Sequence, residues 1–79
     1  MLIADGSIEM KYAVIFEKTP TGWSAYAPDL PGLGVAGSTF EETERLMREG
    51  VEFHIQGLRA DGEPVPVPTT RVAEIGIPA

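Results

Sequence analysis

The sequence predicts a small α+β domain with the element order β-β-β-α-β, in which one helix packs on one face of a single sheet. Three observations indicate this fold: two short runs rich in β-branched and aromatic residues, a long amphipathic segment, and a last apolar run near the C-terminal end. The chain of 79 residues has room for one such domain. A chain this short buries a modest share of its surface, so we expect a homodimer or a larger homo-oligomer.

The first strand is predicted over residues 11–17 (KYAVIFE), where apolar side chains fall on both alternating faces. Because both faces are apolar, we expect this strand at the centre of the sheet. A turn rich in proline and glycine then connects it to a second strand over residues 23–27 (WSAYA), and the short connection favours an antiparallel hairpin. A short third strand is expected over residues 35–37.

The helix is predicted over residues 40–59. Thr39 and Glu42 have the spacing of a capping box, and Ser38 with Glu41 offers an equally good register. One apolar stripe is formed by Phe40, Met47, Val51, His54 and Leu58. On the polar side, two favourable i,i+4 ion pairs are expected, Glu41–Arg45 and Glu44–Arg48.

The two ends of the chain carry weaker patterns. Alternating prolines in residues 63–68 (EPVPVP) favour an extended connection to a last strand over residues 71–77, which the helical crossover allows to pair parallel with an earlier strand. Residues 1–9 are interpreted as a leader whose order the sequence leaves open, with residues 2–4 as an added edge strand. Residues 10–79 then form a single domain. One helix covers one face of the sheet only, and self-association is the simplest cover for the other.

Charge and composition restrict the partners. Twelve acidic against six basic residues give a net charge of -6, which disfavours direct binding to nucleic acid and favours a basic macromolecule. The absence of cysteine and the presence of one histidine exclude a disulfide framework, a thiolate zinc site and a multi-histidine metal cage, so no metal or cofactor is expected. No apolar run has the length of a membrane span, and the N-terminus lacks the basic start of a secretory signal, so a cytoplasmic location is expected.

Four residues are candidates for contact with a protein partner: Trp23, Tyr26, Asp29 and Leu30. Trp23 and Tyr26 are three positions apart in one strand and therefore lie on opposite faces, and each serves equally well as core or as interface. The aromatic residue that faces away from the helix is the better candidate. Asp29 belongs to residues 28–32 (PDLPG), which form either a rigid turn with Asp29 bonded to nearby amides or a preformed loop at the partner surface.

Catalytic chemistry is not expected. His54 lies on the apolar stripe of the helix without a second histidine, so we interpret it as a residue at the margin of the core. A metal-dependent nuclease needs several converging carboxylates, and only Glu17 and Asp29 follow strands where such a site would lie. The glycines of residues 32–37 (GLGVAG) lack the strand that precedes a nucleotide-binding loop and are interpreted as turn and bulge positions.

Residues 10–68 resemble the small N-terminal domain of the HicB antitoxin family. The shared motifs are KYAVIFE, then GWSAYAPDLPGLGVAGSTFEET, and then DGEP after the helix. The resemblance implies a partly degraded ribonuclease-H-like fold and a non-enzymatic function, in which the domain covers the active site of a small basic HicA-type toxin that cleaves messenger RNA. Many members carry a C-terminal DNA-binding domain, and since this chain ends at Ala79 the resemblance does not extend to regulation through DNA. The alternatives are an oligomeric binding or scaffold domain without a toxin, and a residual nuclease.

Overall fold

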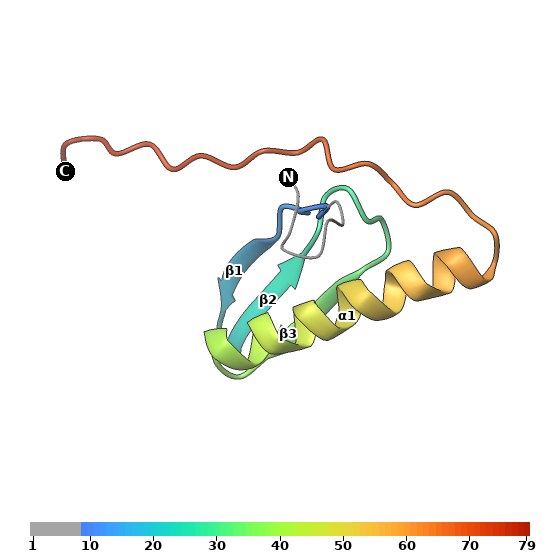
Figure 1. The fold of residues 1–79 in the computed structure, drawn as a ribbon. Helices are drawn as coiled ribbons and strands as arrows, with labels where there is room; N and C mark the ends of the chain where they lie inside the picture. Colours follow the sequence, from blue (N-terminus) through green and yellow to red (C-terminus); the bar gives the residue numbers. More distant parts are fainter. Residues whose placement is uncertain (1–8) are drawn as a thin grey trace.

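The computed structural model describes residues 9–79. Three strands and one helix follow one another along the chain: β1 (Ile15–Thr19), β2 (Gly22–Tyr26), β3 (Gly34–Gly37) and α1 (Phe40–Ala60). The strands form one antiparallel sheet in the order β1-β2-β3, and α1 lies across one of its faces (Figure 1). The predicted α+β class with a β-β-β-α arrangement is therefore confirmed.

The first strand begins later than predicted and occupies a different place in the sheet. Pairing runs from Ile15 opposite Tyr26 to Thr19 opposite Gly22, and residues 11–14 pair with no other described strand. β2 is the middle strand and β1 is an edge strand, so the predicted central position of residues 11–17 is wrong. The physical reason is that two successive short turns join neighbours in order, which puts the second strand between the first and the third. Apolar residues on both faces of residues 11–17 indicate that both faces have apolar contacts, but they do not indicate the position of the strand in the sheet.

The core lies between the sheet and α1. Its buried apolar residues are Ala25, Ala27, Leu30, Met47 and Ile55. Three further apolar residues pack against this cluster: Phe16 of β1, Val14 just before β1, and Val35 of β3. Thr43 is also buried, and its hydroxyl donates a hydrogen bond of 2.7 Å to the carbonyl oxygen of Thr39, so this polar group is satisfied.

The start of α1 is fixed by side chains. The Thr39 hydroxyl accepts a hydrogen bond of 3.0 Å from the backbone N–H of Glu42, which confirms the first of the two predicted capping registers. The Glu42 carboxylate in turn accepts a hydrogen bond of 2.8 Å from the backbone N–H of Ser38. This reciprocal pair joins the end of β3 to the helix and holds the two elements at a defined angle.

One of the two predicted ion pairs on the helix surface is wrong. Arg48 lies 3.7 Å from Glu44, as expected. Arg45 instead reaches forward to Glu49 at 3.3 Å. Glu41 belongs to the first turn of α1, where the free backbone N–H groups of the helix already stabilise a carboxylate. Both observed pairs are exposed and contribute a few tenths of a kcal/mol at most, about 0.5.

The chain after α1 does not return to the sheet as a strand. The helix ends where the backbone N–H of Asp61 bonds the carbonyl of Gly57, and Gly62 follows with a φ of +69°. Residues 63–79, here called the tail, are extended and run back along α1 before projecting beyond the sheet (Figure 1). The predicted strand over residues 71–77 is therefore wrong for the single chain, because these residues are all exposed and pair with no described strand. Residues 2–4, expected as an edge strand, lie outside the described residues.

Candidate protein-binding surface

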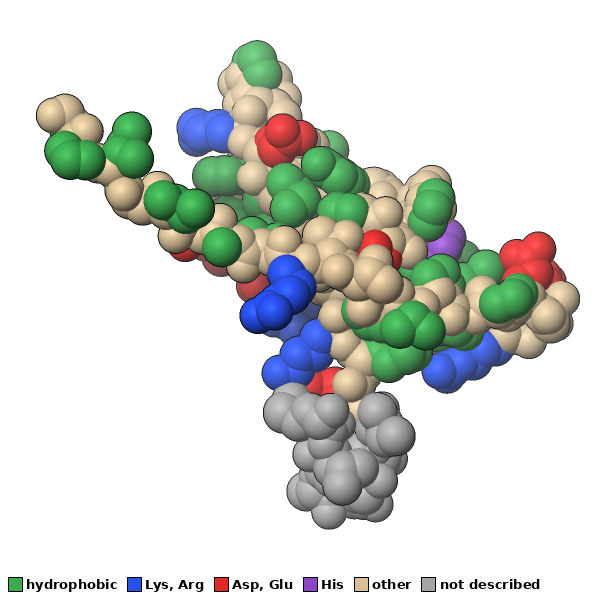
Figure 2. Space-filling model, turned by 90° about the horizontal axis from the view of Figure 1, so that it is seen from above, with side chains coloured by type: hydrophobic (Ala, Val, Ile, Leu, Met, Phe, Trp, Pro, Cys, Tyr) green, Lys and Arg blue, Asp and Glu red, His purple; other side chains and the backbone are tan. Residues whose placement is uncertain are grey.

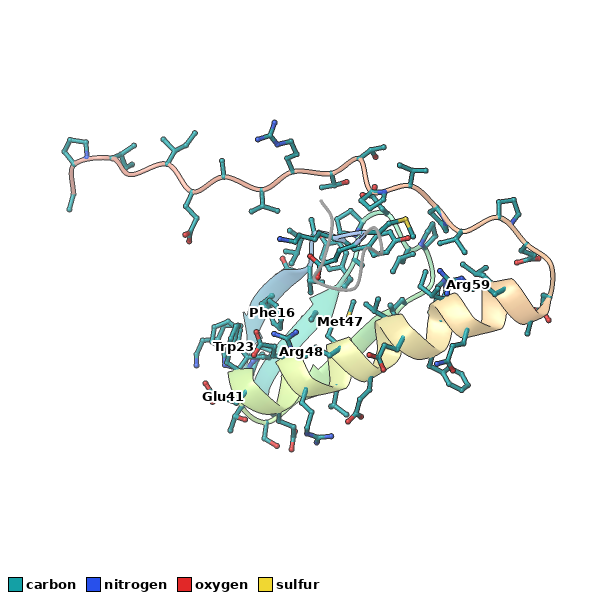
Figure 3. The ribbon with its side chains drawn as sticks, in the orientation of Figure 1. Phe16, Trp23, Glu41, Met47, Arg48 and Arg59 are labelled. Atoms are coloured by element: carbon teal, nitrogen blue, oxygen red, sulfur yellow. The ribbon has the colours of Figure 1, made fainter. Side chains whose placement is uncertain are left out.

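The alternation of side chains along β2 separates the two faces of the sheet. Trp23 and the buried Ala25 point toward the helix, and Tyr26 points the opposite way. The Trp23 ring meets the ring of Phe40 edge-on, with centroids 5.4 Å apart, and the Lys18 ammonium lies 5.3 Å from the Trp23 ring centre. Trp23 is thus packed against the start of α1, as Figure 3 shows.

Tyr26 lies on the face that α1 leaves uncovered. Its side chain is 44% exposed, and its cross-strand neighbours are Ile15 of β1 and Gly34 of β3. Glu17 follows on the same face of β1, opposite Ser24. A tyrosine held on a strand, with an apolar neighbour on one side and no side chain on the other, leaves part of its ring open to a partner.

The loop after β2 continues this face and is anchored from inside. Leu30 is completely buried, and its backbone N–H bonds the carbonyl of Ala27 at 3.0 Å. The next turn closes with a bond of 3.2 Å from the N–H of Leu33 to the carbonyl of Leu30. Leu30 therefore holds the loop in place from the core, while Pro28 and Pro31 on either side are exposed. The backbone of the loop is restricted because its two prolines fix φ and its central residue is buried.

Asp29 holds the tail. Its carboxylate accepts hydrogen bonds of 2.8 Å from the backbone N–H groups of Thr69 and Thr70, and of 3.1 and 2.9 Å from their hydroxyls. We call this arrangement the Asp29 clamp. These bonds, chiefly those from the backbone of Thr70 and Thr69, lower the pKa of Asp29 from 3.8 to about 2. The interpretation of Asp29 as a turn residue bonded to nearby amides is wrong: its hydrogen bonds in the described chain go to residues 40 and 41 positions away.

The histidine and the acidic side chains stand apart from one another in the part of the chain that the structure describes. Within residues 9–79, no group of three or more histidine, cysteine or acidic side chains is close enough to hold a metal ion. Glu17 is exposed on the uncovered sheet face, whereas Asp29 is occupied by the clamp. His54 is partly buried on α1, at the margin of the core. In the same residues, no helix combines the length and the apolar character needed to cross a membrane.

The four candidate residues thus occupy three different settings. Trp23 faces the helix, Leu30 is in the core, and Asp29 binds the tail, while Tyr26 alone among them is largely exposed on the uncovered face. Residues that the sequence did not single out are the two threonines of the clamp. In the sequence, the two threonines appear only as adjacent hydroxyl residues after alternating prolines. This pattern does not indicate which carboxylate they bind.

The sequence is similar to a family of bacterial proteins and to several of its relatives. Residues 12–76 match the family model described as HicB-like antitoxin of bacterial toxin-antitoxin system. A UPF0150 protein of Synechocystis is 39% identical over 56 residues, which are 70% of this chain and 71% of that protein. An uncharacterized 14.9 kDa protein of Haemophilus phage HP1 is 37% identical over 72% of this chain and 43% of its own length. The protein named antitoxin HicB 2 of Photorhabdus laumondii is 31% identical over 92% of this chain. The match covers 53% of that antitoxin, so the chain spans about half the length of two of these relatives.

Proposed function

Because the chain belongs to the HicB-like antitoxin family, we propose that it is an antitoxin that binds a small basic HicA-type toxin and covers the surface with which the toxin cleaves messenger RNA. The antitoxin blocks the toxin by covering its surface. This needs a complementary binding surface on the antitoxin and no reacting group. The protein acts in the cytoplasm, where the messenger RNA is translated, and as a homodimer or larger assembly.

The observation that carries the contact surface is the exposed ring of Tyr26 on the uncovered sheet face, beside the loop anchored by Leu30. Aromatic anchors on rigid supports dominate the binding free energy of many interfaces, because they lose little conformational freedom on binding. Tyr26 is therefore the anchor, and the loop prolines Pro28 and Pro31 extend the apolar surface around it.

The charge of the chain supports a basic partner. The net charge is -6, and Glu17 places one carboxylate directly on the proposed face. Acidic groups at the rim of an interface mainly accelerate association with a basic protein and make it sensitive to salt. Removing Glu17 should accordingly slow association without greatly changing the dissociation rate.

The test is co-expression with the product of the neighbouring small gene, followed by purification of the complex and an assay of RNA cleavage. Tyr26→Ala should weaken binding by about 2 kcal/mol, which is roughly 30-fold in Kd, and should restore RNA cleavage. The matched control is Phe53→Ala, which removes an aromatic ring that is 78% exposed on α1, away from the proposed face. This control should bind the toxin as the unchanged protein does.

Two outcomes contradict the proposal in different ways. Equal loss of binding for both variants, or loss for Phe53→Ala alone, would move the contact surface to α1. Absence of any complex with the neighbouring product would favour the alternative of a binding or scaffold domain without a toxin. Magnesium-dependent RNA cleavage by the chain alone, abolished by changing Glu17 or Asp29, would revive the nuclease alternative.

A further inference from the structure

A groove of about 490 Å³ lies between α1 and the segment that leads into β1. Tyr12, Val14 and Phe16 line it on one side, and Met47 and Val51 of α1 line it on the other. Figure 3 labels Phe16 and Met47 on these two sides. The groove therefore combines these apolar side chains with charged ones, and it lies beside an edge of the described sheet.

The strand edge beside this groove has no partner among residues 9–79. Among the described strands, β1 pairs with β2 alone, so its outer edge is open, and residues 11–14 before it pair with no described strand. In an antiparallel pair, every second residue directs its N–H and C=O away from the partner strand, so this edge presents a row of unpaired groups. An open strand edge beside a groove with apolar side chains is the geometry that accepts an added strand.

The tail has the complementary pattern. Ala73, Ile75 and Ile77 alternate with Val72 and Glu74, so one side of an extended chain is entirely apolar and the other is mixed. Ile75 and Ile77 are 86% and 83% exposed, and Figure 2 shows hydrophobic side chains along the part of the tail that stands clear of the body. Isoleucine side chains this exposed in alternating positions are typical of a strand that lacks its sheet.

The tail is held in a way that directs this segment away from its own groove. Val65 packs on the core, the Tyr12 hydroxyl donates a hydrogen bond to the carbonyl of Pro66, and the Asp29 clamp fixes Thr69 and Thr70. Residues 71–79 follow directly and project past the sheet (Figure 1). The first part of the tail is thus part of the folded body, and the second part has no contact surface of its own.

We propose that residues 71–77 add as a fourth strand to the free edge of β1 in a second copy of this chain, with Ala73, Ile75 and Ile77 facing the groove. The second copy returns its own tail in the same way, which gives a two-fold symmetric dimer. The wall of the groove carries three carboxylates, of Glu9, Glu44 and Glu52, against the one guanidinium of Arg48, which lies 3.7 Å from Glu44, and this acidic excess suits a segment that opens with Arg71. The proposal concerns self-assembly and is independent of the toxin.

The exposed area of the chain is of the size that such an exchange requires. The chain exposes 6128 Å², whereas a compact monomer of 8.5 kDa is expected to expose about 4,700 Å². The excess of about 1,400 Å² over the whole chain compares with the 1,200–2,000 Å² that a stable interface buries in total. The exposed side chains of Val72, Ile75 and Ile77 in the tail contribute to that area.

The first test is the molar mass of the full chain in solution, measured by light scattering after size exclusion. The unchanged chain should have twice the mass of 8.5 kDa. Ile75→Glu should halve the measured mass, because a charge would enter the groove. Val72→Glu is the matched control, with the same gain of charge on the opposite side of the strand, and it should stay dimeric. Both side chains are exposed in the single chain, so far-ultraviolet circular dichroism should show that both variants fold.

The second test identifies which chain fills the groove. Chains with labelled isoleucine methyl groups are mixed with unlabelled chains, and nuclear Overhauser contacts are filtered for pairs between the two. Contacts from the Ile75 and Ile77 methyls to the Tyr12 or Phe16 rings of the unlabelled chain are expected.

Four outcomes overturn the proposal. They are a monomer at every concentration, a dimer that Ile75→Glu leaves intact, a dimer that Val72→Glu also dissociates, and groove contacts that occur only within one chain. The last outcome includes contacts from the methyls of Ile3 or Ile8, which would mean that the N-terminal segment fills the groove.

Discussion

Apolar side chains are largely buried in residues 15–60, whereas those at the end of the tail are exposed. In the first region, Met47 and Ile55 of α1 meet Ala25 and Leu30 within the chain, and each strand has a neighbour adjacent in sequence. In the tail, polar groups are satisfied at the Asp29 clamp, but the apolar side chains beyond it lie in solvent. The difference teaches that residues 15–60 bury an apolar core within one chain, whereas the end of the tail has apolar side chains that the same chain leaves exposed.

The largest expected effect tests the self-sufficiency of the body. Met47 is 2% exposed and central to the core, so Met47→Ala should lower the free energy of unfolding by about 2–5 kcal/mol. Phe53→Ala, on the exposed side of the same helix, should change it by less than about 0.5 kcal/mol. Chemical denaturation at a fixed protein concentration measures both. Similar losses for the two variants would mean that burial against the sheet is not what stabilises α1.

A smaller effect is expected at the hairpin that starts the sheet. A Cβ on Gly22 would lie 2.1 Å from the carbonyl oxygen of Gly37, at a φ of +157°, so Gly22→Ala should cost about 1–3 kcal/mol. Gly57 has no atom within 4 Å of its Cβ position and lies inside α1, so Gly57→Ala should instead stabilise the fold by about 0.5–1 kcal/mol. Thermal unfolding of the two variants should give shifts of opposite sign, and shifts of the same sign would contradict the close approach of the two strands.

The smallest expected effect concerns the Asp29 clamp, which links residues 15–60 to the tail. Hydrogen bonds from Thr69 and Thr70 lower the pKa of Asp29 from 3.8 to about 2, so the clamp is fully formed above the ordinary pKa and is lost as the pH falls through about 2. The amide signals of Thr69 and Thr70 should follow this titration in NMR spectra. In Asp29→Asn, the Thr69 and Thr70 amide signals should no longer change with this titration. In Glu17→Gln, which removes an exposed carboxylate elsewhere, they should still change with it. An unchanged titration in Asp29→Asn would show that another group holds the tail.

The local signals of the sequence predicted the body well. The helix was expected over residues 40–59 and occupies Phe40–Ala60, because its cap, its apolar stripe and its end are all encoded within a few residues of one another. The opposite faces of Trp23 and Tyr26 follow in the same way from the period of a strand. The proposal of Tyr26 as the partner contact stays a prediction.

What the sequence did not predict depends on groups far apart along the chain. The Asp29 clamp joins residues 40 and 41 positions away, and no local pattern distinguishes it from an ordinary turn. The position of β1 at the edge was missed because apolar residues on both of its faces also suit a strand whose outer neighbour comes from elsewhere. The last strand was predicted from its alternating pattern, and this prediction is wrong for the described chain, since an alternating apolar pattern does not show whether a partner strand exists within the same chain.

The rigidity of the Asp29 clamp has a consequence for the size of any assembly. Each chain has one tail and one groove, so exchange between copies stops at two only if the tail leaves the body at an angle that lets both grooves be filled at once. At any other angle, every added copy leaves one tail and one groove free, and the chains grow into an open filament. On the proposal that the tail adds to a second copy, the four hydrogen bonds to Asp29 orient the start of the added segment and so help to determine whether the assembly closes.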